Sequence, residues 1–420
     1  MSTSQDLIPK IPLKPEDTEL DFGFLADLAL KIVYADTNCT TERAAEKLKL
    51  SMPVTEELLQ HLYREKFVEI RGLITYGNNR YGMLDRGWQR AQRLLDMNGY
   101  IGPAPVSLEA YTTMMLRQSA ATEMIQPEAV RTAMSGLVLP GATVQTLGLV
   151  ASSRRSLFMT GPSGNGKTTI ATALHSAQSG EIWIPYAIEV DGQIIKVFDL
   201  HNHQPVSVEG LARYDGRWTK IKRPLVIVGG EMTIDTMDLI YSQTVRFYEA
   251  PFQMKANGGT LVIDDFGRQR IDPHELLNRW IVPLEGRVDY LTLHTGKKIE
   301  VPFEQLLIFA TNLDPADLVD DAFLRRMGYR LFVTAPTKDL YAQIFRRYVE
   351  ESGFTYDSKY LDFLFRLYAE EKRPLRGCEP RDIIERCVDL CKYENRSKVL
   401  SPELLELAWN NYFGTRLTTN

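Results

Sequence analysis

The stretch GPSGNGKTT, at residues 161–169, constrains the fold of this 420-residue chain more than any other feature. It matches the pattern GxxxxGK[ST], in which glycines let a loop wrap a polyphosphate with its backbone N–H groups. The apolar run SLFM (156–159) precedes it, and the helix-forming run TIATALHSA (169–177) follows. This order predicts a buried strand, a phosphate-binding loop and a helix whose N-terminus adds positive potential. The residues expected to hold the phosphates are Gly161, Pro162, Ser163, Gly164, Asn165, Gly166, Lys167, Thr168 and Thr169.

Apolar runs alternate with helical patterns between residues 157 and 335. Strands that alternate with helices favour an α/β fold built on a parallel sheet. The expected strands are SLFMTG, PLVIVGG, TLVIDD, LLIFATN and YRLFVTA. Two further segments, 184–200 and 288–303, have turn signals between β-rich arms, and each predicts a hairpin.

Polar side chains follow two of these expected strands. Asp264 and Asp265 end one apolar strand, and Asn312 ends the next. Because ligands of open α/β sheets bind at the carboxyl ends of the strands, these residues are expected beside the phosphate loop. There Thr168 and Asp264 would hold Mg²⁺, the carboxylate through water. Asn312 is a candidate for orienting an attacking water, although Asn is also a common turn residue.

Four arginines in the C-terminal half are candidates for contacts to the nucleotide or to a partner. Arg325, Arg326 and Arg330 lie between an expected helix end and a strand. A strand-start arginine such as Arg330 is the weaker candidate of the three. Arg381 begins a helix, where a cation opposes the helix dipole, and this favours a ligand or partner role for it.

These motifs occur in an order that resembles the AAA+ ATPases over roughly residues 130–415. GPSGNGKT resembles Walker A, LVIDD resembles Walker B and FATN resembles sensor 1. FLRRMGYR resembles the arginine-finger region, EPRDIIE resembles sensor 2, and GLVLPG (136–141) resembles the segment that packs near adenine. The hairpin 290–302 is similar to the pre-sensor-1 hairpin of the branch that includes MoxR-like proteins, magnesium chelatases and enhancer-binding activators. The GAFTGA loop of the activators is absent.

The resemblance implies ATP and Mg²⁺ as ligands and a ring, expected to be a hexamer. Asp265 would polarise the attacking water, and Arg326 and Arg325 would be finger arginines donated to a neighbouring subunit. Arg381 would contact the γ-phosphate. AAA+ proteins usually have Glu where Asp265 stands, and its side chain is shorter by about 1.5 Å. Either the water sits closer to the strand and hydrolysis is intact, which we expect, or turnover is slow and the protein is a switch.

The N-terminal region resembles a winged helix-turn-helix, with three helical patterns followed by a two-stranded wing. Residues 41–93 contain ten Lys/Arg and seven Asp/Glu, which is only mildly basic. Glu56 and Glu57 begin the expected recognition helix, where they would repel phosphates, so a protein partner or ring assembly is favoured over DNA. The expected segments are a flexible N-terminus (1–21), the winged helix-turn-helix (22–100), a linker with helices (101–135), the α/β nucleotide-binding domain (136–336) and an α-helical lid (337–420).

Composition excludes several classes of protein. A net charge of −5 gives no overall positive field for nucleic acid. No apolar run approaches the roughly 18–20 residues of a membrane span, and residues 1–22 have no hydrophobic stretch. We therefore expect no signal peptide and a cytoplasmic protein without membrane contact. His201 and His203 lack a third ligand for a metal. The four cysteines lack CxxC spacing and are expected to be reduced: Cys39, Cys378, Cys387 and Cys391.

Three functions fit these motifs. The favoured hypothesis is an ATP-hydrolysing motor or switch that remodels a complex of unidentified proteins, with hydrolysis at the subunit interfaces of a ring. The second is a DNA-binding, ATP-dependent regulator that uses the winged helix. The third is a nucleotide-dependent scaffold with little turnover.

Overall fold

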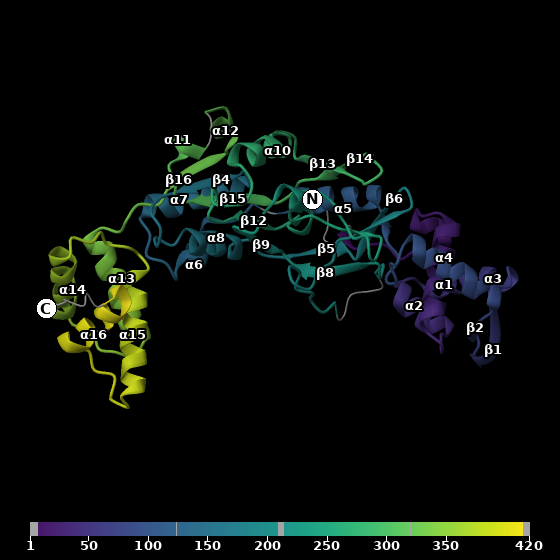
Figure 1. Cartoon of the computed structure of the whole chain (residues 1–420), viewed down its shortest axis with the longest axis horizontal. Helices are drawn as coiled ribbons and strands as arrows, with labels where there is room; N and C mark the ends of the chain where they lie inside the picture. Colours follow the sequence, from purple (N-terminus) through teal and green to yellow (C-terminus); the bar gives the residue numbers. More distant parts are fainter. Residues whose placement is uncertain (1–6, 123, 209–213, 319–320, 415–420) are drawn as a thin grey trace. The chain divides into compact units, whose positions relative to one another are not determined.

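The computed structural model describes residues 7–122, 124–208, 214–318 and 321–414. The chain forms two compact units, whose helices and strands are shown in Figure 1. Unit 1 comprises residues 1–123, 179–261 and 275–306, and unit 2 comprises residues 124–178, 262–274 and 307–420. These units differ from the consecutive segments expected from the sequence, because the chain leaves and re-enters each of them.

The N-terminal part of unit 1 has the predicted order of three helices, an antiparallel hairpin and a further helix. Capping side chains set the starts of its first two helices. The Asp21 carboxylate accepts the Phe24 N–H (2.9 Å), and the Thr40 hydroxyl accepts the Arg43 N–H (3.2 Å). The elements are α1 (Phe22–Ala35), α2 (Thr41–Leu48), α3 (Met52–Arg64), β1 (Val68–Thr75), β2 (Asn78–Met83) and α4 (Asp85–Met97).

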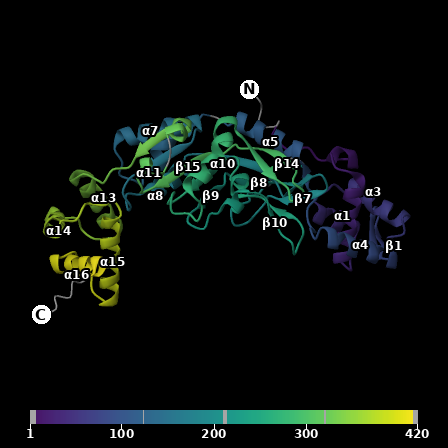
Figure 2. The ribbon, with the colours of Figure 1, turned by 45° about the horizontal axis from the view of Figure 1, so that its top comes forward.

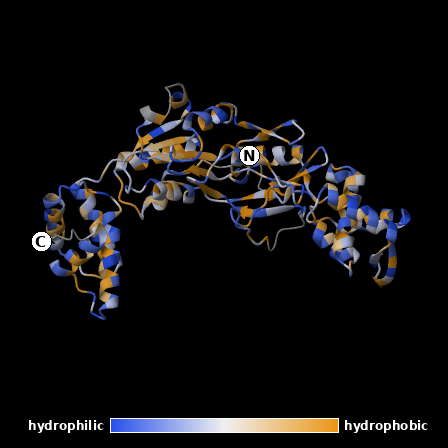
Figure 3. Ribbon diagram, in the orientation of Figure 1, coloured by the Kyte–Doolittle hydropathy of each residue, from blue (hydrophilic) through white to orange (hydrophobic). Residues whose placement is uncertain are grey.

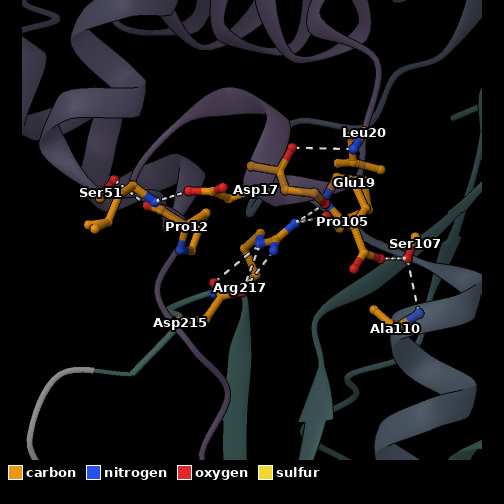
Figure 4. A network of polar contacts seen from close by, with 12 residues as sticks. Pro12, Asp17, Glu19, Leu20, Ser51, Pro105, Ser107, Ala110, Asp215 and Arg217 are labelled. Carbon is orange, nitrogen blue, oxygen red and sulfur yellow. Dashed lines mark hydrogen bonds and ion pairs between the residues drawn. The ribbon is translucent and has the colours of Figure 1, made fainter.

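A buried ion pair holds the segment before α1, which was expected to be flexible, against the rest of unit 1. Arg217 and Asp215 have side chains only 6% and 3% exposed, and their closest atoms are 2.8 Å apart. Arg217 Nη1 also donates to the carbonyls of Thr18 (3.0 Å) and Pro105 (3.2 Å). Figure 4 shows Arg217 between Asp215 and the chain around Pro105. The described N-terminal segment, with its short helix η2 (Pro15–Thr18), is therefore tied to segments far along the chain.

A five-stranded sheet, in the order β10-β11-β7-β6-β3, forms the middle of unit 1. Its β6–β7 pair is the hairpin predicted for 184–200, and Ala187 and Ile194 pack into the hydrophobic core of α1–α4. The β13–β14 pair is the hairpin predicted for 288–303. The elements are β3 (Val106–Ser107), α5 (Leu108–Ala120), β5 (Glu181–Pro185), β6 (Ala187–Val190), β7 (Gln193–Lys196), β8 (Trp218–Lys222), η3 (Ile234–Met237), β10 (Ile240–Tyr241), β11 (Tyr248–Glu249), α9 (Phe252–Lys255), α10 (Pro273–Gly286), β13 (Val288–Thr292) and β14 (Lys298–Pro302).

A second five-stranded sheet, in the order β16-β4-β15-β12-β9, confirms the predicted parallel α/β fold. Strand β4 lies between β15 and β16, with Phe158 opposite both Phe309 and Arg330. Every residue of β4, β12 and β15 is buried, as expected for continuous apolar runs in a parallel sheet. The strands are β4 (Leu157–Thr160), β9 (Leu225–Val228), β12 (Thr260–Ile263), β15 (Leu306–Thr311) and β16 (Tyr329–Phe332).

Helices make up most of the remainder of unit 2. The last four lie together in both views of the ribbon, and hydrophilic and hydrophobic residues share α15 (Figures 1, 2 and 3). Their apolar faces form a common core that includes Tyr341, Phe345 and Trp409. No helix in the described part of the chain is long and apolar enough to cross a membrane. The helices are α6 (Pro127–Met134), α7 (Gly141–Ser153), α8 (Lys167–Ser176), α11 (Pro315–Leu318), α12 (Asp321–Arg326), α13 (Lys338–Glu351), α14 (Ser358–Glu370), α15 (Glu379–Tyr393) and α16 (Pro402–Phe413).

Candidate nucleotide-binding site

The loop between β4 and α8 has a backbone conformation that requires its glycines. Gly161, Gly164 and Gly166 have φ angles of 138°, 79° and 81°, in the region that disfavours a side chain. A Cβ atom at Gly161 would lie 2.1 Å from the carbonyl oxygen of Val333. The GxxxxGK spacing therefore places glycine where the loop turns and where it meets another backbone.

Lys167, the first residue of α8, folds back onto this loop. Its side chain is 8% exposed, and Nζ donates to the carbonyls of Gly161 (2.8 Å) and Pro162 (3.1 Å). Burial lowers the pKa of this ammonium group, and the nearby carboxylates of Asp264 and Asp265 oppose the shift. Phosphate oxygens in the loop would replace neutral carbonyl acceptors with charged ones, which form stronger hydrogen bonds with an ammonium group.

A hydrogen bond joins the start of α8 to the end of β12. Thr168 Oγ1 donates to Asp264 Oδ2 over 2.7 Å, and Asp264 Oδ1 accepts the Asp265 N–H over 2.9 Å. The structure thus brings together the two residues predicted to hold Mg²⁺. A hydroxyl and a carboxylate are hard oxygen ligands, and they fit this ion.

Asp265 occupies a strained turn directly after Asp264. Its φ angle is 47°, in the left-handed region that Asp and Asn tolerate better than most residues, and its side chain is exposed. The next residue, Phe266, is fully buried, with its ring 5.2 Å from that of Phe309 and 6.0 Å from that of Phe158. The buried Phe266 ring holds the turn at the carboxyl end of β12. The positive φ angle gives a physical reason for Asp at position 265.

Asn312 is held by an arginine that the sequence motifs did not single out. Arg268 Nε donates to Asn312 Oδ1 over 3.3 Å, and the Arg268 N–H donates to the Asp265 carbonyl over 3.0 Å. Because a guanidinium can only donate, the amide oxygen of Asn312 faces Arg268, and its NH₂ group is the side that can donate to a ligand. This orientation suits a phosphate oxygen better than the donor hydrogen of an attacking water.

The three arginines near β16 differ in their surroundings. Arg325 is exposed and Arg326 is half-buried, both at the end of α12. Arg330 Nε donates to the carbonyl of Leu324 over 3.1 Å. Arg330 therefore stabilises the turn between α12 and β16.

The start of α15 contacts the phosphate loop directly. The Cys378 N–H donates to the Gly164 carbonyl (2.8 Å), and the Gly377 N–H donates to Asn165 Oδ1 (3.0 Å). A Cβ atom at Gly164 would lie 2.9 Å from Cys378 Sγ. All four cysteines are free thiols, and burial raises the pKa of the Cys378 thiol.

A cavity of about 130 Å³ lies between the loop, α6–α7 and the C-terminal helices. Residues 136–139 line it, within the segment that resembles the adenine-proximal part of AAA+ proteins. Its apolar wall also includes Ile170, Ile344 and Tyr348, while Asn165 and Gly166 bring in the phosphate loop. An apolar wall next to a phosphate loop has the shape and chemistry of a nucleotide site.

Two arginines also line this cavity, and no carboxylate does among its described lining residues. Arg381 donates to Asp382 Oδ1 from both Nη2 (2.9 Å) and Nε (3.1 Å), and Glu385 lies 3.8 Å from its Nε. The bond to Asp382 raises the pKa of Arg381. Arg347, on α13, was not singled out from the sequence, since no motif marks its position.

The described residues contain no group of three or more His, Cys, Asp and Glu side chains that could hold a metal ion without further ligands. His203, considered for such a role, instead accepts the Asp199 N–H at Nδ1 over 3.0 Å and bonds the Lys255 carbonyl through Nε2 over 2.8 Å. Its ring is therefore part of the packing of unit 1.

Residues 337–411 match a family described as a domain of unknown function, DUF8689. No curated protein matches the sequence. Among solved structures, NtrX from Brucella abortus in complex with ADP is 15% identical with a TM-score of 0.42, covering 76% of this chain and 59% of that chain. The chain thus spans less than two thirds of that structure's length.

Two further structures show similarity at the same level. NtrX from Brucella abortus in complex with ATP is 15% identical with a TM-score of 0.41, covering 85% of this chain and 78% of that chain. The Thermotoga maritima RuvB Holliday junction branch migration motor is 12% identical with a TM-score of 0.37, covering 68% of this chain and 70% of that chain.

Proposed function

We propose that this chain is an AAA+ ATPase that binds ATP in the unit 2 cavity and hydrolyses it to ADP and phosphate. The hydrogen bond between Thr168 and Asp264 is the observation that carries the proposal. It joins the helix that follows the phosphate loop to a carboxylate at the end of β12, a buried strand of the same sheet. If Asp264 and Asp265 were only solvated acids at a strand end, a hydrogen bond from Asp264 to the helix after the phosphate loop would not be expected.

Phosphoryl transfer depends on charge neutralisation and on a positioned nucleophile more than on covalent chemistry. Lys167 would turn from the loop carbonyls to the β- and γ-phosphates. Mg²⁺, when held by Thr168 and Asp264, would neutralise charge on the phosphate oxygens. Asp265 would accept a proton from the attacking water, and the Asn312 amide would donate to the γ-phosphate.

A second subunit would complete the site. Arg325 is exposed at the end of α12, which leaves it accessible to a neighbouring molecule, and Arg326 lies beside it. We assign these two as finger arginines in a ring, proposed to be a hexamer. Hydrolysis would then depend on assembly and would occur at subunit interfaces.

The region α1–α4 is proposed to be a winged helix that docks a protein partner. The free end of its β1–β2 hairpin carries hydrophobic residues (Figure 3). Leu73 is 71% exposed, Ile74 is 48% exposed, and Tyr76 is fully exposed. Apolar side chains at a wing tip suit a protein surface better than a phosphate backbone, which attracts Lys and Arg. The proposed role is therefore remodelling of a protein complex.

ATP turnover by the full chain tests the enzymatic proposal. Wild type should release phosphate from ATP, and Asp265→Asn should bind ATP while losing at least about 100-fold in kcat, since general base catalysis contributes about 10²–10⁴. Lys167→Ala should lose binding. Asp96→Asn, at an exposed position of α4, is the matched control and should behave as wild type.

The absence of turnover by the assembled wild-type protein would refute hydrolysis and leave a scaffold. DNA binding that weakens steeply with salt would instead support the second function, a DNA-linked regulator. A ring that forms on addition of ATP, without DNA binding, supports the remodelling function.

A further inference from the structure

The two arginines of the cavity differ in their electrostatic partners. Arg381 is neutralised by Asp382 and Glu385. Arg347 lines the same cavity, but its Nη1 atom is buried and has no hydrogen-bond partner among the described residues. The next residue along α13, Arg346, is exposed and pairs with Glu350 over 2.8 Å. A solvated, paired arginine is thus adjacent to a half-buried one whose donor lacks an acceptor.

A buried guanidinium donor without an acceptor is unfavourable, because it has lost water and gained nothing in return. An anion entering the cavity would remove this cost for Arg347. For Arg381, by contrast, binding an anion would require loss of the two hydrogen bonds to Asp382 or sharing of its charge with that carboxylate. Arg347 therefore gains more from an anionic ligand than Arg381 does.

The phosphate group is the ligand chemistry that best fits this donor. A planar guanidinium presents N–H groups at the spacing of phosphate oxygens, and the bonds are charge-assisted. The same cavity is lined by Asn165 and Gly166 of the phosphate loop. Nδ2 of Asn165 is a second buried donor without a partner among the described residues. Two such donors in one cavity wall indicate a ligand rich in acceptors.

We propose that Arg347, rather than Arg381, is the arginine of the C-terminal helices that binds a phosphate group of the nucleotide. This inference rests on the proposed nucleotide site. Arg381 then makes no phosphate contact, and its bonds to Asp382 lie within the first turns of α15. The role that the resemblance to AAA+ proteins assigns to Arg381 moves to a different helix, α13.

Calorimetric titration of the full chain with ATP, and separately with inorganic tripolyphosphate, tests the proposal. Arg347→Met should weaken binding of both by about tenfold or more, as expected for loss of a charge-assisted hydrogen bond. Arg381→Met should weaken them by less than about threefold. Arg346→Met is the matched control and should bind both as wild type. Arg347→Lys, which keeps the charge without the planar fork, should fall between wild type and Arg347→Met.

Thermal unfolding without ligand gives an independent readout. Arg347→Met should unfold at or above the wild-type temperature, because it removes an unsatisfied buried donor. Arg381→Met should unfold below it, because Asp382 loses its bonds to Arg381 and keeps the one from the Tyr412 hydroxyl. A lower unfolding temperature for Arg347→Met than for Arg381→Met would contradict the assignment.

Three binding results would overturn the proposal: wild-type affinity in Arg347→Met, a larger loss in Arg381→Met, or a loss for ATP that is absent for tripolyphosphate. The last result would indicate that Arg347 contacts the nucleoside and not a phosphate group. Lys167→Ala separates this inference from the proposed function. If wild type binds ATP and Lys167→Ala does not, the nucleotide site stands, and the Arg347 variants decide the inference alone. If wild type binds neither ATP nor tripolyphosphate, both the proposed nucleotide site and the inference about Arg347 are refuted.

Discussion

Replacing Arg217 by Met should destabilise unit 1 more than any change to a surface ion pair. The substitution removes the two Nε bonds to Asp215, at 3.1 and 3.0 Å, and the Nη2 bond at 2.8 Å. It leaves the Asp215 carboxylate buried without its counter-charge and two carbonyls, of Thr18 and Pro105, without their donor. Breaking a buried pair from one side costs about 3–5 kcal/mol, and we expect a loss in the free energy of unfolding within this range.

A double variant separates the charge from the carbonyls. Arg217→Met combined with Asp215→Leu removes both charges, so the uncompensated carboxylate no longer contributes. The two carbonyls still lack a donor, and the expected loss falls to about 1–3 kcal/mol. The double variant should therefore be more stable than Arg217→Met alone.

Urea unfolding followed by tryptophan fluorescence measures these differences, since Trp218, next to Arg217, is buried. Lys220→Met is the matched control, since Lys220 lies on β8, which begins one residue after Arg217. Lys220 pairs with Glu181, but its side chain is 25% exposed and that of Glu181 is 40% exposed, so its loss should cost less than about 1 kcal/mol. An Arg217→Met variant no less stable than Lys220→Met would refute the argument that the buried network holds the N-terminal segment.

Two further outcomes are expected from single groups. Arg268→Ala should lower kcat for ATP hydrolysis by about tenfold with little change in KM. The reason is that Asn312 loses the partner that orients its amide, while binding of ATP in the ground state is unaffected. An unchanged kcat in steady-state assays would contradict this role. Burial lowers the pKa of Lys31 to about 8, so through this group the unfolded chain binds more protons between pH 8 and 10.5, and Lys31 contributes a rise in stability with pH across that window. Burial raises the thiol pKa of Cys39 to about 11, which contributes in the opposite direction, so the comparison with Lys31→Met isolates the lysine. Lys31→Met should be more stable than wild type at pH 7, and this advantage should shrink as the pH rises toward 10.5, as measured by urea unfolding at a series of pH values.

Local patterns predicted the elements of the nucleotide site. The apolar runs that became β4, β12 and β15 are buried strands, and the glycines of the phosphate loop stand where the backbone needs them. These predictions succeed because strand burial, helix capping and turn conformation depend on residues within a few positions of one another.

Contacts between distant segments were not predictable in this way. Arg217 bonds carbonyls 199 and 112 residues away, and Arg268 bonds Asn312 across 44 residues. Nothing in the surrounding sequence distinguishes these arginines from solvated ones. The segment around Pro15 is rich in proline and charge, and this composition predicted flexibility. Its tertiary contacts are with Arg217, about 200 residues away, and a local sequence pattern does not predict a contact at that distance.

The sequence by itself determined the parallel α/β fold, the phosphate loop and the acids at the end of β12, since each follows from short-range periodicity and spacing. Only the tertiary structure decided that Arg347 and Arg381 line one cavity, and that Nη1 of Arg347 is buried there without a hydrogen-bond partner among the described residues. The carboxylates that pair with Arg381 are local, because Asp382 and Glu385 follow it by one and four residues on the same helix. Arg347 also has a carboxylate three residues ahead, Glu350, but that group pairs with Arg346. The burial of Arg347 comes from the packing of segments far apart in the chain, which short-range sequence patterns do not describe.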